Sequence, residues 1–319
     1  MNPQKLRSKE DLIFPDFDDI KVSTKTFTAM TNLKIEIKEL YEKLPITDYV
    51  VIAKKRGRKK KCEFVDPNKD IPEGSIITLK CEGEIRGVEL KPKKNKNNKK
   101  PKWFRNSITL VIILDKPINF KICRNGTFQM TGCKTHEHAE LCIKYIWEYI
   151  KDEKTLYSFS RGKCLETLFI PSMRNIDFSL GFIVDREKLN HYMSPNNQNS
   201  YINNIEKEFH CLLETSFGYT GVNIKIPLNQ DISKMKIKKL VYNDEWVKTN
   251  STYQEYLNLL PKKEMENKLS SNRYNTFLVF HSGKVIMSGL TSYFMKDVYY
   301  YFLKIMKNGY ESIEERLDI

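Results

Sequence analysis

Two lysine-rich segments carry the most distinctive chemistry of this chain, which is the neutralisation of phosphate charge. Residues 54–61 read KKRGRKKK and residues 91–102 read KPKKNKNNKKPK, each with seven basic and no acidic side chains. The chain has 54 basic and 40 acidic residues, so its whole positive excess of 14 equals the charge of these two segments. This confinement of charge predicts a polyanionic partner, of which nucleic acid is the commonest.

The first basic segment contains an Arg-Gly-Arg core, Arg56-Gly57-Arg58. Extended arginines enter narrow A·T-rich minor grooves, so this core is similar to an AT-hook, although Lys59 stands where proline is usual. A nuclear-localisation signal and a solvated loop remain alternatives. The second segment is expected to contact phosphates without reading sequence. The basic residues expected to contact DNA are Lys54, Lys55, Arg56, Arg58, Lys59, Lys60, Lys61, Lys93, Lys94, Lys96, Lys99 and Lys100.

The sequence carries no recognisable catalytic or metal-binding motif. Cys133, His136, His138 and Cys142 are close in sequence, but their spacing matches no standard zinc site. There is no phosphate-binding glycine loop, H-E-x-x-H motif or nucleophile elbow. We therefore expect no metal, no cofactor, no small-molecule substrate and no enzymatic activity.

Cysteine usage and hydropathy indicate an intracellular protein. The seven cysteines form an odd set without a C-x-x-C pair, which is typical of reduced thiols. No apolar run reaches the roughly 18 residues that span a bilayer, and the charged N-terminus lacks the apolar core of a signal peptide. We expect no membrane contact, and a location in the nucleus or, for a viral protein, in the host cytoplasm (a viral factory) or the virion.

Two similar segments predict the elements that position binding residues. Residues 120–132 read FKICRNGTFQMTG and residues 277–289 read FLVFHSGKVIMSG, each with two glycines six residues apart. The alternating pattern around Asn-Gly or Ser-Gly predicts a β-hairpin in each segment.

A long amphipathic helix is expected after each hairpin. Thr135 is suited to cap the first helix and Asn308-Gly309 to end the second. Apolar residues at helical spacing predict the buried stripes, which are Ala139, Cys142, Ile143, Ile146, Trp147 and Ile150 in the first helix and Phe294, Val298, Tyr301, Phe302 and Ile305 in the second.

Two further pairs of segments occur in matching order. IRGVELK (85–91) pairs with YTGVNIK (219–225), and residues 22–45 and 173–193 both indicate a strand followed by a helix. We therefore predict an α+β fold of two pseudo-symmetric repeats that join in one antiparallel sheet with helices on one side. The predicted divisions are an N-terminal arm (1–20), a first repeat (21–152) with basic insertion loops (53–76 and 92–104), a connector (153–172), a second repeat (173–308) with an insertion (229–272), and a C-terminal tail (309–319).

These segments resemble the TATA-binding protein family, in which each of two repeats ends in a Ser-Gly-Lys turn, a short strand closing in Thr-Gly and a long helix. Residues 277–289 are very similar to that segment, and residues 120–132 share its glycines and its Thr-Gly end. The extra segments are most similar to the divergent members of large nucleocytoplasmic DNA viruses. The resemblance implies a curved antiparallel saddle, with helices on its convex face, that binds and bends A·T-rich double-stranded DNA through the minor groove.

In the second repeat, the resemblance places six side chains on the groove face. Phe280 stands at a wedge position and Tyr219 near the other one, although ordinary core packing is the alternative for both rings. The remaining four are Leu278 and Ile286 as apolar contacts, Ser288 at a threonine position and Asn175 at a base-edge asparagine position. Asp177 departs from the pattern, because an apolar residue is expected there and an acid would repel phosphates.

The first repeat departs further from the family. Cys123 stands at the wedge position, and Lys121 and Gln129 stand at groove-lining positions. Thr131 matches the family, whereas Thr24 and Thr26 replace an expected Asn and Val. Because a cysteine offers little stacking surface, we expect the two halves to bind DNA unequally.

The function implied is that of a transcription initiation factor that binds A·T-rich duplex and presents its helices to other initiation factors or RNA polymerase. A sequence-tolerant architectural or DNA-packaging protein is one alternative, favoured by the polar first repeat. A protein-interaction scaffold without DNA contact is the other.

Overall fold

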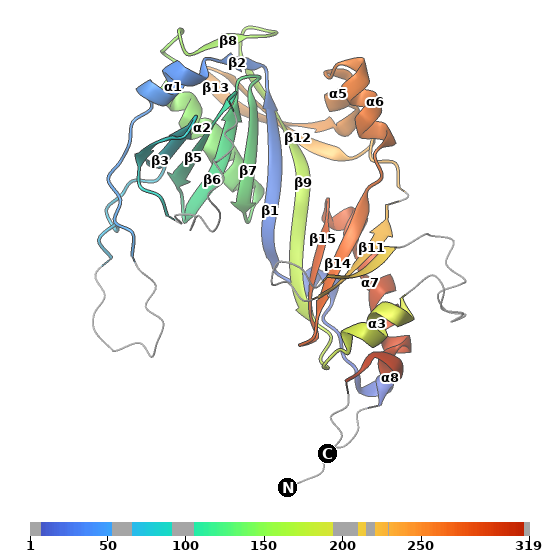
Figure 1. Ribbon diagram of the computed structural model, residues 1–319. Helices are drawn as coiled ribbons and strands as arrows, with labels where there is room; N and C mark the ends of the chain where they lie inside the picture. The colour runs from blue at the N-terminus through green and yellow to red at the C-terminus, as the bar shows by residue number, and fades with distance from the viewer. Residues whose placement is uncertain are drawn as a thin grey trace. The chain divides into compact units, whose positions relative to one another are not determined.

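The chain folds into two compact units (Figure 1). The N-terminal unit comprises Thr26–Ile170 and Lys236–Tyr253, and the C-terminal unit comprises Met1–Lys25, Pro171–Met235 and Gln254–Ile319. The computed structural model describes residues 8–52, 66–90, 105–193, 210–214, 221–228 and 230–315. The basic segments 54–61 and 91–102 and the candidate wedge Tyr219 lie outside these residues.

The elements confirm the predicted α+β class. The strands are β1 (Val22–Thr31), β2 (Leu33–Ile35), β3 (Ile76–Cys81), β4 (Glu84–Gly87), β5 (Ser107–Ile113), β6 (Pro117–Cys123), β7 (Thr127–Cys133), β8 (Tyr157–Phe159), β9 (Leu165–Ser179), β10 (His210–Glu214), β11 (Gly221–Pro227), β12 (Lys236–Asn243), β13 (Glu245–Thr252), β14 (Tyr274–Phe280) and β15 (Lys284–Gly289). The helices are α1 (Ile37–Lys43), α2 (His136–Ile150), α3 (Arg186–Tyr192), α5 (Tyr253–Asn258), α6 (Lys262–Ser270), α7 (Ser292–Asn308) and α8 (Tyr310–Ile313), with short 3-10 turns at Lys9–Asp11 and Phe17–Asp19.

One large antiparallel sheet contains most of these strands. Its hydrogen-bonded order is β10-β11-β14-β15-β9-β1-β7-β6-β5-β3-β4, and the β12–β13 hairpin is attached to β9. The order β1-β7-β6-β5-β3 therefore has a counterpart in β9-β15-β14-β11-β10, each made of one strand, a hairpin and two further strands. Strands β2 and β8 form a separate pair.

The two predicted hairpins are confirmed, and each turn is held by the same backbone contacts. In the N-terminal unit, the Thr31 amide donates to the Gly126 carbonyl oxygen at 3.1 Å. In the C-terminal unit, the Leu180 amide donates to the Gly283 carbonyl oxygen at 2.8 Å. Both glycines have positive φ, and a Cβ at either would overlap a backbone carbonyl oxygen of the segment beneath the turn. Close backbone approach therefore requires glycine at both turns.

The long helices build the two cores, but the α7 stripe differs in part from the prediction. Val298 and Tyr301 are half-buried, whereas the buried residues also include Met295, Tyr299, Leu303 and Met306. Thr135 caps α2 by accepting a hydrogen bond from the His138 amide, and every residue of the predicted α2 stripe is buried. In the C-terminal unit, the α7 ring of Phe302 stacks on Phe277 of β14, with ring centroids 4.0 Å apart. Each unit thus has a sheet face covered by one long helix.

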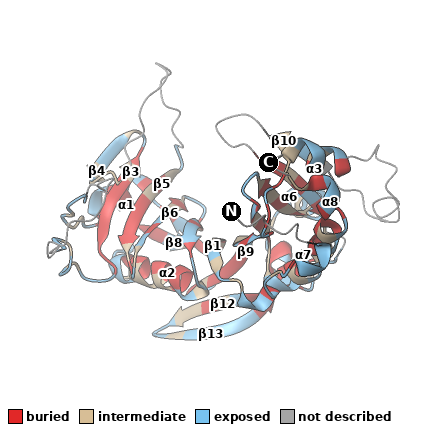
Figure 2. Ribbon diagram, turned by 90° about the horizontal axis from the view of Figure 1, so that it is seen from below, coloured by how far each residue is buried: buried red, intermediate tan, exposed pale blue. Residues whose placement is uncertain are grey.

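The β12–β13 hairpin follows residue 235 but completes the core of the N-terminal unit. Strand β12 pairs with the first part of β9, where Leu240 lies opposite Thr167. The ring of Tyr242 lies 5.6 Å from that of Trp147 on α2, and Lys248 forms an ion pair with the buried carboxylate of Glu140. Figure 2 shows β13 largely exposed, as expected for an edge strand.

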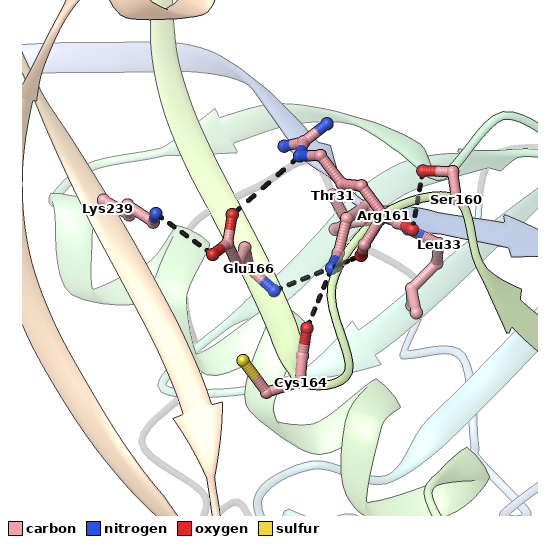
Figure 3. A network of polar contacts seen from close by, with 8 residues as sticks. Thr31, Leu33, Ser160, Arg161, Cys164, Glu166 and Lys239 are labelled. Atoms are coloured by element: carbon pink, nitrogen blue, oxygen red, sulfur yellow. Dashed lines mark hydrogen bonds and ion pairs between the residues drawn. The ribbon is translucent and has the colours of Figure 1, made fainter. Parts of the chain in front are cut away.

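A buried asparagine joins three segments of the N-terminal unit (Figure 3). The fully buried Asn32 side chain donates to the carbonyl oxygens of Arg161 and Cys164, both at 2.8 Å, and accepts from the Glu166 amide at 2.9 Å. The Ser160 hydroxyl donates to the Asn32 carbonyl oxygen. These bonds fix the turn before β9 against the end of β1.

The compact units differ from the predicted divisions in four places. The N-terminal arm is part of a core, because Phe17 is buried against Tyr299 of α7 with ring centroids 5.4 Å apart. The predicted connector contains β8 and the start of β9, and the predicted C-terminal tail contains the buried residues Tyr310 and Ile313. The predicted 229–272 insertion contributes β12 and β13 to the N-terminal unit.

The pairing of residues 85–91 with residues 219–225 is wrong as a structural equivalence. Strand β11 pairs with the hairpin strand β14, whereas β4 pairs with β3. The counterpart of β11 is β5, which pairs with the hairpin strand β6. Two strands with similar alternation need not be equivalent, because alternation alone does not specify the partner strand.

Candidate nucleic-acid interface

The sheet of the C-terminal unit has one face covered by α7 and an opposite face formed by alternate residues. Along β14, Asn275, Phe277 and Val279 are buried, whereas Thr276, Leu278 and Phe280 are half-buried. Because successive side chains on a strand point to opposite faces, the second set lies away from the α7 core. We call this surface the C-terminal face; it comprises Asn175, Asp177, Asn223, Lys225, Thr276, Leu278, Phe280, Ile286 and Ser288.

The strand register places the predicted residues of this unit side by side. Leu278 lies opposite Ile286, which lies opposite Asp177 on β9. In the next row, Thr276 lies opposite Ser288, which lies opposite Asn175. Residues directly opposite in an antiparallel pair share a face. The structure therefore brings Leu278, Ile286, Ser288 and Asn175 together on one side of the sheet.

Phe280 lies at the end of this face. It is opposite Gly221 at the start of β11, and it is half-buried, whereas the neighbouring Val279 is fully buried. The ring therefore lies on the side of the sheet away from the α7 core. A glycine opposite an aromatic side chain leaves the ring without a bulky cross-strand neighbour.

The N-terminal unit has a corresponding surface with a more polar composition. Lys121 lies opposite Gln129 on one side and Thr109 on the other, and Asn119 lies opposite Thr131. These side chains alternate with buried residues of β6 and β7 and are half-buried or exposed. We call this surface the N-terminal face; it comprises Lys80, Thr109, Asn119, Lys121, Cys123, Gln129 and Thr131.

Cys123, at the predicted wedge position, lies opposite Ser107 and is half-buried. Burial raises the pKa of its thiol. On β1, Thr24 and Thr26 are half-buried, and the following Phe27 and Ala29 lie in the core. The structure therefore places all three predicted residues outside the core.

Sequence reasoning missed several members of both faces. Thr276, Asn223 and Lys225 belong to the C-terminal face, and Lys80, Thr109 and Asn119 belong to the N-terminal face. Alternation in the strands beside each hairpin was the available signal, but it required knowing which strand is the neighbour. Thr109 in particular was missed, because the sequence pattern matches residues 85–91, and not β5, with the segment that forms β11.

The cysteine and histidine group near the start of α2 is occupied by other contacts. Cys133 and Cys142 are buried, His136 Nδ1 lies 2.9 Å from Glu140 Oε1, and His138 Nε2 lies 3.1 Å from Asp115 Oδ1. Within the described part of the chain, no group of three or more His, Cys, Asp or Glu residues is arranged to hold a metal. None of the described helices combines the length and apolar character needed to cross a bilayer.

Comparison with known proteins gives two viral sequence relatives, while no protein-family model matches the chain. The Invertebrate iridescent virus 6 protein named "Uncharacterized protein 335L" is 27% identical over 304 residues, covering 91% of this chain and 84% of that protein. A protein of Acanthamoeba polyphaga mimivirus named "TATA-box-binding protein-like" is 31% identical over 172 residues. That match covers 47% of this chain and 43% of the mimivirus protein, so it spans less than half of either.

A structural comparison aligns the chain with Methanococcus jannaschii TBP over 92% of this chain and 99% of that one, with a TM-score of 0.40 and 14% identity. The mimivirus similarity agrees with the resemblance carried by the two hairpins. Over about half of its length, the chain is therefore similar to a viral protein named TATA-box-binding protein-like.

Proposed function

We propose that this protein binds A·T-rich double-stranded DNA through the minor groove and acts in transcription initiation by binding and not by catalysis. The observation that supports this most strongly is the C-terminal face. There, the apolar Leu278 and Ile286 adjoin the hydroxyl-bearing Thr276 and Ser288 on the sheet side away from α7.

The composition of the C-terminal face suits a minor groove. A·T pairs offer only acceptors there, whereas the 2-amino group of guanine adds a donor that obstructs close apolar approach. Apolar side chains can therefore lie against A·T pairs, while hydroxyl groups donate to the acceptors. Phe280, at the end of the face, has the size and position to insert at a base step.

The N-terminal face supports a different contribution to binding. Lys121 and Lys80 provide positive charge, and Gln129, Asn119 and Thr131 provide polar contacts. Such side chains suit phosphate and sugar contacts, which position a protein without reading sequence. This polar face also favours the second candidate function, that of a sequence-tolerant architectural protein.

The proposed role in initiation requires partner proteins. We propose that the helical side of each unit contacts other initiation factors or RNA polymerase. Competition binding distinguishes the two candidate functions. An initiation factor prefers A·T-rich over G·C-rich duplex by at least about a hundredfold, whereas an architectural protein discriminates little.

We expect the double substitution Leu278→Glu with Ile286→Glu to weaken binding to an A·T-rich duplex by about a hundredfold. The two carboxylates would face the polyanion and would be desolvated against the groove. Fluorescence anisotropy with a labelled duplex, at one fixed salt concentration, measures the effect.

The matched control is Tyr293→Glu with Leu269→Glu, which adds the same charge at exposed positions of α7 and α6. The control is expected to change affinity less than about threefold, because long-range repulsion is screened within about 10 Å at 0.1 M salt. Equal losses of DNA affinity in both variants would show that the added negative charge alone weakens binding. That result would contradict binding through the C-terminal face. Full affinity of the first variant would favour a scaffold without DNA contact.

The wedge positions predict unequal bending by the two units. Phe280→Ala is expected to reduce the DNA bend, because an inserted ring unstacks a base step and a methyl group does not. Cys123→Ala is the matched change in the N-terminal unit and is expected to leave the bend unchanged. Fluorescence energy transfer between dyes at the two duplex ends measures both, and similar losses of bending in the two variants would show two equivalent kinks.

A further inference from the structure

Asp177 is the one acidic side chain of the C-terminal face as defined above. It is exposed on β9, opposite Ile286. Its neighbours Ile176 and Phe178 are buried in the α7 core, so alternation along the strand directs the Asp177 carboxylate to the opposite side. The N-terminal face, as defined above, contains no acid. The carboxylate is therefore a feature of one unit.

The carboxylate of Asp177 keeps most of its capacity to accept hydrogen bonds. The Ser23 hydroxyl lies 3.3 Å from Asp177 Oδ1 and 3.2 Å from the Asn175 carbonyl oxygen, and its single proton serves one of them at a time. Among the described residues, no Lys, Arg or His nitrogen forms an ion pair with Asp177. An ionised carboxylate has about four acceptor sites, so acceptor sites remain for a donor from outside the protein.

We propose that Asp177 is a specificity-determining residue that accepts a hydrogen bond from the exocyclic 2-amino group of guanine. The C-terminal face then selects a G·C pair at one position of an otherwise A·T-rich duplex. This inference rests on the proposed minor-groove binding and adds to it a sequence preference that the apolar residues alone would oppose.

The minor groove offers a carboxylate one kind of partner. Its base edges present acceptors in every pair, and the 2-amino group of guanine is the only donor. Opposite an A·T pair, Asp177 would face acceptors and nearby phosphates, and its desolvation would be uncompensated. Opposite a G·C pair, the same carboxylate gains a hydrogen bond to a charged acceptor, which is stronger than a neutral one.

Neighbouring side chains are expected to strengthen the preference for a G·C pair opposite Asp177. Leu278 and Ile286 lie in the same row as Asp177 and would exclude water from the contact. In the adjacent row, Thr276, Ser288 and Asn175 carry hydroxyl or amide donors, which suit the acceptors of A·T pairs. On this face, the row of hydrogen-bond donors therefore lies beside the row that ends in Asp177, a hydrogen-bond acceptor.

The test uses the full-length protein and a series of A·T-rich duplexes, each with a single G·C pair at a successive position. A parallel series carries inosine·C at the same positions, because inosine differs from guanine only by lacking the 2-amino group. We expect one position at which the wild-type protein binds the G·C duplex about tenfold more tightly than the inosine·C duplex, equivalent to about 1.4 kcal/mol. Asp177→Val is expected to abolish this difference and to raise affinity for the all-A·T duplex.

Asp297→Val is the matched control, because it removes the same charge from an exposed position of α7. It is expected to retain the tenfold preference, and thermal unfolding of both variants verifies that they fold. If the wild-type protein binds the all-A·T duplex but binds the G·C and inosine·C duplexes equally at every position, the role of Asp177 is overturned and the proposed function stands. The role of Asp177 is likewise overturned, and the proposed function stands, if Asp177→Val keeps the preference for G·C over inosine·C. A wild-type protein that binds none of the duplexes would overturn both.

Discussion

Asn32→Leu is expected to destabilise the N-terminal unit by about 4 kcal/mol, the largest effect of any single substitution considered. Leucine has the branched shape of asparagine, although it is larger, and makes none of its three side-chain hydrogen bonds. The carbonyl oxygens of Arg161 and Cys164 and the amide of Glu166 would lose their partner inside a fully buried site. For a unit of this size, the loss corresponds to a decrease in Tm of about 10 °C.

Tryptophan fluorescence during urea unfolding measures this effect, because Trp147 and Trp246 both belong to the N-terminal unit. Asn250→Leu, at an exposed position of β13, is the matched control and is expected to change stability by less than about 0.5 kcal/mol. A shift for Asn32→Leu no greater than that of the control would show that the Asn32 contacts contribute nothing to folding.

Gly283→Ala is expected to destabilise the C-terminal unit by about 3 kcal/mol. The residue has a φ of +73°, which costs an alanine about 1 kcal/mol, and the added Cβ would overlap the Phe182 carbonyl oxygen. The turn would have to move away from the segment that follows β9, and the bond from the Leu180 amide would be lost. Hydrogen exchange of the β14 and β15 amides measures the change as a loss of protection.

Gly181→Ala separates the cost of a positive φ from the cost of the Cβ overlap. Gly181 has a φ of +82°, but a Cβ there would meet no atom within 4 Å. This control therefore carries the conformational cost without the overlap, and we expect a loss of about 1 kcal/mol. Equal losses at the two glycines would mean that the hairpin turn accommodates the methyl group without moving.

Local sequence signals were sufficient for the elements that repeat. The Asn125-Gly126 and Ser282-Gly283 turns, the cap at Thr135 and the apolar stripe of α2 each depend on residues close together in the chain. The alternation of β14 was also sufficient to separate Leu278 from the core. These features follow from the period of the helix and of the strand, which the sequence displays directly.

Long-range pairing was not predictable in the same way. No local pattern indicates that β12 pairs with Leu165–Phe169 of β9 or that Lys248 reaches Glu140. The Asn32 contacts are equally hidden, because an asparagine after a strand has the composition of an ordinary turn. Membership of the N-terminal face depended on the same knowledge, since Thr109 is recognised only when β5 is known to be the neighbour of β6.

The β12–β13 hairpin has a consequence for how the chain matures on the ribosome. A nascent chain that has emerged only as far as residue 170 contains the first segment of the N-terminal unit. It lacks β12, the strand that pairs with the first part of β9. Glu140 is then without the ammonium of Lys248, and Trp147 is without Tyr242, until translation has passed residue 253. The unit translated first is therefore finished late, and a gene cut between the halves would release a product that lacks part of its own core.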